Sequence, residues 1–175
     1  MKYKLNKVYY LKENKEGSLS QNKVKISLEN NKLIFSFNVS DKNPYNPYKN
    51  DNDNLYEYDV VEVFISFNKR YDEYFEYELS PFGVRFLGII DNPTLSSPLL
   101  TLIEPNFDFN IDETVDGYNA SIIIDVTNID NFSIENILFN CYAIDVENNK
   151  QNLYALNPTL CGSFHMAKFL SELEY

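Results

Sequence analysis

The chain has 175 residues, a hydrophobic share of 44% and a formal net charge of −11 at pH 7. This length suits one domain with a buried core. The acidic charge, with no cluster of Lys and Arg, argues against nucleic acid and anionic membrane surfaces as partners. No stretch approaches the roughly 18 apolar residues of a membrane-spanning helix. We therefore expect a single soluble domain, residues 1–175, that binds neither nucleic acid nor membranes.

The N-terminal stretch MKYKLNKVYYLKENKEG contains neither an apolar core nor a small-residue cleavage site. It therefore lacks the features of a secretory signal, and we expect the chain as written to be cytoplasmic. Cys141 and Cys161 stand alone without CxxC spacing, which favours two buried thiols over a disulfide or a zinc site. The sequence does not indicate an oligomeric state.

The first third of the chain predicts antiparallel strands. Residues 2–11 alternate weakly and indicate a first strand. Residues 24–28 and 33–39 alternate apolar and polar side chains on either side of an Asn-Asn pair. Asn tolerates the positive φ of a tight turn, so these two runs predict a hairpin. Residues 41–54 hold two Asn-Pro pairs and an Asp/Asn run, which exclude a regular element.

Residues 55–83 predict the two central strands, joined by a polar turn. One face of both strands is apolar. The opposite face carries Glu62, Glu76 and Glu78, with Tyr56 at the start of the stretch. The simplest interpretation of these acids is a solvated sheet face, because outward strand positions are usually polar.

The rest of the chain continues the pattern. Further strands are predicted at residues 83–90, 107–112, 118–126, 137–146 and 153–156. The loop at 91–102 holds two prolines, and short helical segments are predicted within 128–136 and 166–175. No amphipathic helix of ordinary length is present. About nine short strands therefore predict an all-β fold, an antiparallel β-sandwich of the jelly-roll type with little helix.

The sequence holds few groups for catalysis. The single histidine, His165, lies between Phe164 and Met166 without an identifiable third group for a triad, which favours a structural role. GxSxG, P-loop and dinucleotide motifs are absent. Paired carboxylates hydrolyse glycosides in many enzymes, which leaves a weak glycosidase built on the glutamates of the central strands as an alternative.

Carbohydrate recognition requires a different set of groups. Aromatic faces stack on the C–H faces of a pyranose, and carboxylates or amides bind its hydroxyls. Tyr56, Glu62 and the loop tyrosines Tyr45 and Tyr48 supply such a set. The alternative interpretation is that these tyrosines only cover the core, as amphipathic side chains do.

Four segments carry a resemblance to a known family, in the order YEYDVVEVFISF, YDEYFEYELSPFG, ILFNCYAID and LYALNPTLCGSFHMAKF. Together with the hairpin KVKISLENNKLIFSFNVSD, they resemble the family-nine carbohydrate-binding modules and their DOMON-like relatives. The resemblance extends from Val24 to Phe169. Its most specific pieces are the Asp59-x-x-Glu62-Val63-Phe64 core and the late Phe164-His165 pair with Phe169.

The resemblance implies a β-sandwich that binds sugars without cleaving them. Modules of this family stack a sugar between two aromatic rings, usually Trp, and bind it with a Glu of the VEVF strand. Tyr56 stands where the family has its first stacking Trp, and Glu62 matches the binding Glu. The expected function is therefore a non-catalytic carbohydrate-binding module, with a sugar or glycan end as its partner.

The chain departs from the family in several positions. It contains no Trp. Glu76 and Glu78 stand in place of the family's Arg and Asn on the return strand. The second stacking ring has no clear match, and Tyr154 and Phe164 are the nearest aromatic residues. These four residues complete the predicted carbohydrate site, and the departures motivate an alternative, a structural or protein-interaction sandwich that has lost sugar binding.

No cofactor is expected. Some family modules bind calcium structurally, so calcium is the metal that the resemblance suggests, although no ligands match. Asp51 and Asp53 offer oxygen ligands but lack the twelve-residue EF-hand pattern, which favours a mobile acidic loop. A haem-binding relative would need axial ligands on opposite sides of the iron, and the adjacent His165 and Met166 do not supply them.

Overall fold

A computed structural model describes residues 5–94 and 97–174. The described strands are β1 (Asn6–Glu13), β2 (Leu19–Glu29), β3 (Lys32–Ser40), β4 (Val60–Ser66), β5 (Glu73–Leu79), β6 (Arg85–Asp91), β7 (Leu99–Leu102), β8 (Asp108–Thr114), β9 (Gly117–Asp125), β10 (Leu138–Glu147), β11 (Lys150–Ala155) and β12 (Ser171–Glu172). The 3-10 helices are η1 (Leu55–Glu57), η2 (Ile134–Asn136) and η3 (Ala167–Phe169).

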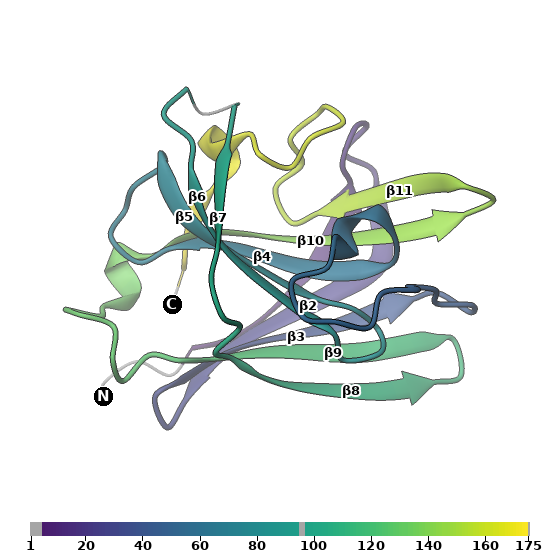
Figure 1. Cartoon of the computed structure of the whole chain (residues 1–175), viewed down its shortest axis with the longest axis horizontal. Coiled ribbons are helices and arrows are strands. Elements are labelled where there is room, and N and C mark those ends of the chain that lie inside the picture. Colours follow the sequence, from purple (N-terminus) through teal and green to yellow (C-terminus); the bar gives the residue numbers. More distant parts are fainter. Residues whose placement is uncertain (1–4, 95–96, 175) are drawn as a thin grey trace.

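The strands form one curled antiparallel sheet in the order β7-β6-β5-β4-β10-β11-β1-β2-β3-β9-β8, with β12 paired to β10. Figure 1 shows the two halves of this sheet as layers, with β4 and β10 in one and β3, β9 and β8 in the other. The predicted all-β antiparallel sandwich is therefore confirmed.

The predicted number of about nine strands is wrong, because the described residues form twelve. β7 lies in the stretch that its prolines marked as a loop, and it is a four-residue strand at the edge of the sheet. β12 has two residues and lies where a helix was expected. Both strands are too short to show a periodic pattern. Residues 2–4 of the predicted first strand, residues 95–96 of the predicted loop and residue 175 of the predicted helix lie outside the described residues.

The main core fills the space between the two layers. Val61, Val63 and Ile65 of β4 point into it, as the period of two predicted. The ring of Phe35 on β3 lies 6.2 Å from that of Phe139 on β10, so the layers are in direct contact. Apolar burial of this kind is the dominant favourable term in folding.

Two turns show why the local sequence produces hairpins. Asn30 and Asn31, between β2 and β3, have φ values of 49° and 61°, so the predicted hairpin is confirmed. Gly117 starts β9 with φ 156°, and a Cβ added there would lie 1.9 Å from the carbonyl oxygen of Val39. Only glycine therefore allows β9 to approach β3 at this point.

A second apolar cluster covers the outer face of β4, β5 and β10. These strands contribute Phe64, Tyr74 and Tyr142 to the cluster. The chain after β11, residues 156–174, which we call the C-terminal segment, contributes Phe164 and Leu170. As a result β4 is buried on both faces. The outer face of β4 and β5, which the sequence predicted to be exposed to solvent, is thus covered by residues from late in the chain.

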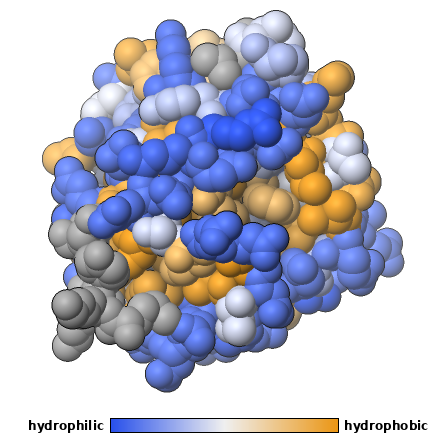
Figure 2. All heavy atoms as spheres, turned by 90° about the vertical axis from the view of Figure 1, so that its left-hand side faces the viewer, coloured by the Kyte–Doolittle hydropathy of each residue, from blue (hydrophilic) through white to orange (hydrophobic). Residues whose placement is uncertain are grey.

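Figure 2 shows one end of the molecule, the left-hand side of Figure 1. Hydrophilic residues cover most of this face, and apolar side chains are visible in patches between them. Among the described residues, no helix has the length and hydrophobicity needed to cross a bilayer.

Candidate functional site

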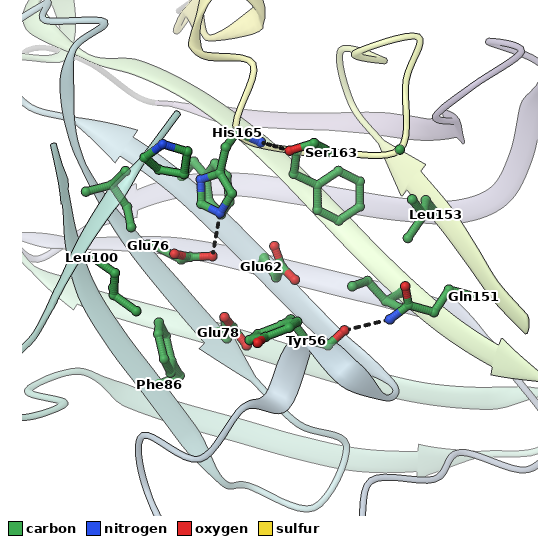
Figure 3. A pocket seen from close by; sticks show the side chains of 16 residues that line it. Tyr56, Glu62, Glu76, Glu78, Phe86, Leu100, Gln151, Leu153, Ser163 and His165 are labelled. Atoms are coloured by element: carbon green, nitrogen blue, oxygen red, sulfur yellow. Dashed lines mark hydrogen bonds and ion pairs between the residues drawn. The ribbon is translucent and has the colours of Figure 1, made fainter. Parts of the chain in front are cut away.

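A cavity of about 340 Å³ opens on the outer face of β4 and β5. Its floor carries Glu62 from β4 with Glu76 and Glu78 from β5, and the C-terminal segment adds Phe164 and His165 (Figure 3). This volume lies within the range of small-ligand pockets, about 300–1,000 Å³.

Strand register brings the three acids together. Glu62 lies directly opposite Glu78 in the β4–β5 pairing, and Glu76 follows two residues away on the same face. Their side chains are nearly inaccessible, with exposed fractions of 1% for Glu62, 6% for Glu76 and 0% for Glu78. The interpretation of these residues as a solvated sheet face is wrong, because the C-terminal segment and η1 cover this face.

Burial changes the protonation of these acids. It raises the pKa of Glu76 to about 8 and the pKa of Glu62 and of Glu78 well above the ordinary value, since the charged form loses its hydration. The mutual repulsion of the three groups acts in the same direction on Glu62 and Glu78. Glu76 is therefore mainly protonated at pH 7, and burial favours the protonated form of Glu62 and of Glu78 in the same way.

Several of their oxygens have no protein partner. Oε1 of Glu62 and both carboxyl oxygens of Glu78 are buried without a hydrogen bond of good geometry to any described residue, and the nearest polar groups to Glu78 include the carboxyl group of Glu76 and the backbone of Tyr56. An unpartnered buried polar group typically costs about 1–3 kcal/mol. The protein tolerates this cost at a cavity, which is typical of groups that bind a ligand.

His165 is positioned by a chain of hydrogen bonds. The side-chain amide of Asn92 donates to the hydroxyl of Tyr74 at 3.3 Å, and this hydroxyl forms a hydrogen bond of 2.9 Å with Nδ1 of His165, in which we assign the hydroxyl as the donor. The other ring nitrogen, Nε2, then carries the proton and faces Oε1 of Glu76 at 3.7 Å. Burial lowers the pKa of His165 to about 4, so the ring is neutral at pH 7.

The expected structural role of His165 holds in part. Its ring stacks on Phe64 with centroids 4.9 Å apart, which anchors the C-terminal segment to β4. The same ring also lines the cavity, which the sequence analysis did not anticipate. Its partners, Tyr74 and Asn92, lie 91 and 73 residues away in the chain, so no local signal marks this arrangement.

The aromatic residues differ in how they meet the cavity. Tyr56 on η1 is 46% exposed, and its carbonyl oxygen accepts a hydrogen bond of 2.8 Å from the side chain of Gln151. Phe164 is buried and stacks on Tyr142 at 4.1 Å, so it presents only part of its ring. Phe86 from β6 lines the opposite side. Neither Gln151 nor Phe86 stood out in the sequence.

Three tyrosines considered for the site lie elsewhere. Tyr154 is on β11, half-buried against the core between the layers, and does not line this cavity. Tyr45 and Tyr48 pack edge-on against Tyr58, with ring centroids 5.4 Å and 5.8 Å apart. The structure therefore gathers Tyr56, the three glutamates and Phe164 of the predicted set, and it leaves Tyr154 apart.

A group of three aspartates lies away from the cavity. One carboxyl oxygen from each of Asp41, Asp59 and Asp145 lies within 4.8 Å of the others. Oδ2 of Asp41 has no hydrogen-bond partner among the described residues, and burial raises the pKa of Asp59 to about 7. These oxygens fit the ligand preference of calcium, and they are the residues that would hold such an ion. Its charge would offset the repulsion between the three acids.

The acidic loop once considered for calcium has a structural role instead. The carboxylate of Asp51 accepts hydrogen bonds from the backbone N–H of Arg85 at 2.9 Å and from its guanidinium at 2.6 Å. Asp53 accepts a hydrogen bond from the backbone N–H of Asn50 at 3.0 Å. Both cysteines are free thiols, Cys141 buried and Cys161 partly exposed.

Neither a protein-family model nor a curated protein matches the chain. Three solved structures share its fold at 14% sequence identity. A candidate carbohydrate-binding protein of Bacteroides uniformis matches with a TM-score of 0.73, over 94% of this chain and 84% of its own. A family-nine carbohydrate-binding module of Caldicellulosiruptor kristjanssonii in complex with cellotriose matches with a TM-score of 0.56, over 84% of this chain and 70% of its own. A family-nine module from the same organism in complex with glucose matches with a TM-score of 0.55, over 84% of this chain and 72% of its own. The chain therefore has the fold of the family-nine carbohydrate-binding modules.

Proposed function

We propose that the chain is a non-catalytic carbohydrate-binding module, and that the cavity between Tyr56 and Glu62 receives a sugar unit at the end of a glycan. The observation that carries this proposal is the combination found in one cavity. An exposed aromatic ring lies beside buried carboxyl groups whose oxygens have no protein partner. A pyranose has the complementary surfaces, an apolar C–H face and a rim of hydroxyls.

In this proposal each residue has a distinct task. The ring of Tyr56 stacks on the apolar face of the sugar. Glu62 binds its hydroxyls, assisted by Glu76 and Glu78. A protonated carboxyl group both donates and accepts a hydrogen bond, so it binds a hydroxyl in either orientation. Phe164 and Phe86 supply apolar walls, and Gln151 holds η1 in place through the carbonyl of Tyr56.

The protonation of the acids supports binding rather than hydrolysis. Glycoside hydrolysis requires one protonated and one ionised carboxyl group, as acid and as base or nucleophile. Burial raises the pKa of Glu76 to about 8 and raises the pKa of Glu62 and of Glu78 well above the ordinary value, which favours the protonated form of all three acids in the free cavity. His165, with its pKa lowered to about 4, offers an unprotonated Nε2 only if the hydrogen bond from Tyr74 is lost.

The test is calorimetric titration with cellotriose, a sugar bound by one of the modules that share the fold. We expect binding by the unmodified chain, and a loss of affinity of at least about tenfold in Tyr56→Ala and in Glu62→Gln, since each removes one contact of roughly 1.4 kcal/mol or more. Tyr45→Ala is the matched control, because Tyr45 is also exposed, 55% against 46% for Tyr56, but lies outside the cavity.

Two results would contradict the proposal. Equal affinities for the unmodified chain and both cavity variants would place the sugar elsewhere. No binding of cellotriose, glucose or a broad glycan panel would instead favour the alternative, a sandwich that serves as an interaction module.

A further inference from the structure

The acids of the cavity have no positive counterpart. Glu62, Glu76 and Glu78 line it, whereas no Lys or Arg does so among the described residues. The single nearby base is His165, whose Nε2 lies 3.7 Å from Glu76, beyond hydrogen-bond distance. The two arginines of the chain pair elsewhere, Arg85 with Asp51 and Arg70 with Asp72. The protein itself therefore does not neutralise this group of acids.

The unpartnered oxygens define what the cavity lacks. They are Oε1 of Glu62 and both carboxyl oxygens of Glu78, and they belong to residues directly opposite each other in the β4–β5 register. Figure 3 shows the three carboxyl groups as neighbours on the cavity floor, below His165 and beside Tyr56. A primary ammonium group has three N–H donors and one positive charge. It therefore supplies the hydrogen-bond donors and the positive charge that the three acids lack.

We propose that the cavity selects a sugar with a free amino group, of the glucosamine type, over the corresponding neutral sugar. This inference rests on the proposed function, since the sugar ring still stacks on Tyr56. On binding, the ammonium group keeps its proton, and one glutamate releases its proton to solvent and forms a charge-assisted hydrogen bond. A hydroxyl group at the same position forms only a neutral hydrogen bond, which is weaker.

A metal ion fits this cavity less well. Among the described residues, the group of three acids whose oxygens lie within 4.8 Å of one another is Asp41, Asp59 and Asp145, not the three glutamates. An ammonium group does not need all three acids, because it can bind the carboxyl groups of Glu62 and Glu78, which lie opposite each other in the register, and leave its third N–H to another acceptor. The exposed ring of Tyr56 beside the acids also favours an organic cation with an apolar face over a bare ion.

The experiment compares three trimers with the same β-1,4-linked gluco backbone. They are cellotriose, the glucosamine trimer of chitosan, and its N-acetylated form, in which the nitrogen carries no charge. Titrations at pH 6 and 0.15 M salt keep the amino groups charged and screen the acidic surface. We expect the chitosan trimer to bind about 10- to 100-fold more tightly than cellotriose, and the N-acetylated trimer to show no such gain.

Variants show whether the preference comes from the cavity. Glu78→Gln keeps the shape of the side chain but cannot ionise, so we expect the ratio of chitosan-trimer to cellotriose affinity to fall toward one. Glu76→Gln provides a second variant if the first does not fold, as judged by its circular dichroism. Glu73→Gln is the matched control on the same strand, exposed and outside the cavity, and we expect it to keep the ratio.

The outcomes separate the two proposals. Binding of cellotriose with equal or higher affinity than the chitosan trimer overturns the amino-sugar preference and leaves sugar binding intact. A preference that survives both cavity variants shows non-specific attraction of a cation to an acidic chain, and it also overturns the inference. Binding of none of the three trimers overturns the inference and the proposed function together.

Discussion

At the residue scale, Glu76 shows how a polar strand position becomes part of a binding cavity. The alternation in β5 places it outward, yet the C-terminal segment covers that face and leaves it 6% exposed. Its carboxyl group is therefore removed from water and lies near the second apolar cluster, with Oε1 at 3.7 Å from Nε2 of His165. Burial places this carboxyl group in the cavity, and it also raises the free energy that is needed to ionise it.

This cost predicts how stability depends on pH. A glutamate of the unfolded chain titrates near pH 4.5, whereas burial raises the folded pKa of Glu76 to about 8. Between these values the folded state binds one proton more, so the free energy of unfolding falls as pH rises, by up to about 1.4 kcal/mol per pH unit for this group. Glu62 and Glu78 act in the same direction.

We therefore expect urea unfolding to show a lower stability at pH 8 than at pH 5, and Glu76→Gln to reduce this loss by about 2–4 kcal/mol. Glu73→Gln, exposed on the same strand, should leave the pH dependence unchanged. His165 contributes with the opposite sign, because its lowered pKa of about 4 makes the folded state lose stability as pH falls below about 6.5. A pH dependence that is identical in Glu76→Gln and the unmodified chain would contradict the assignment.

At the element scale, the β8–β9 turn connects local sequence to the assembly of the sheet. Gly117 leads β9 into contact with β3, where Ser40 is its register partner. A side chain at Gly117 would collide with the backbone of Val39, since the added Cβ would lie 1.9 Å from its carbonyl oxygen. The turn thus decides how nine residues of β9 pair with β3.

Gly117→Ala should accordingly destabilise the protein by about 2–4 kcal/mol, because backbone must move to admit the new carbon. Gly17→Ala is the control, since Gly17 also has a positive φ, 76°, but no atom lies within 4 Å of its added Cβ. Its expected cost is the conformational penalty alone, about 1–2 kcal/mol. Thermal unfolding of the two variants compares them directly, and equal losses would rule out the collision.

At the scale of the whole molecule, the C-terminal segment is the part that completes the cavity. It crosses the outer face of β4 and brings Phe164 and His165 over the acids. Asn14, between β1 and β2, holds this segment from the far end of the sequence. Its side-chain amide donates to Thr159 at 2.8 Å, and its Oδ1 accepts the backbone N–H of Thr159 at 2.8 Å.

Asn14→Ala should therefore affect binding at a distance. It removes three side-chain hydrogen bonds, two buried ones to Thr159 and a partly buried one to Cys161, so we expect a loss of about 2–4 kcal/mol in stability. We also expect weaker binding of cellotriose, because the segment that carries Phe164 loses its anchor. Asn38→Ala is a suitable control, since Asn38 makes one exposed side-chain hydrogen bond, to Asn119. Unchanged sugar affinity in a destabilised Asn14→Ala variant would show that the segment is held by other contacts.

The sequence by itself determined most of the strands and several turns of this protein, because alternation with a period of two and the positive φ of Asn and Gly are local properties, but it did not reveal the short strands β7 and β12. It also identified Tyr56 and Glu62 as neighbours in one stretch. Only the tertiary structure decided that Glu62, Glu76 and Glu78 share a buried face, since register and coverage depend on contacts across the sheet. The role of His165 and the separation of Tyr154 from the cavity were decided in the same way, by packing between residues far apart in the chain. The burial of these acids, the resulting rise in their pKa and the lack of a Lys or Arg among the described residues that line the cavity all follow from that packing.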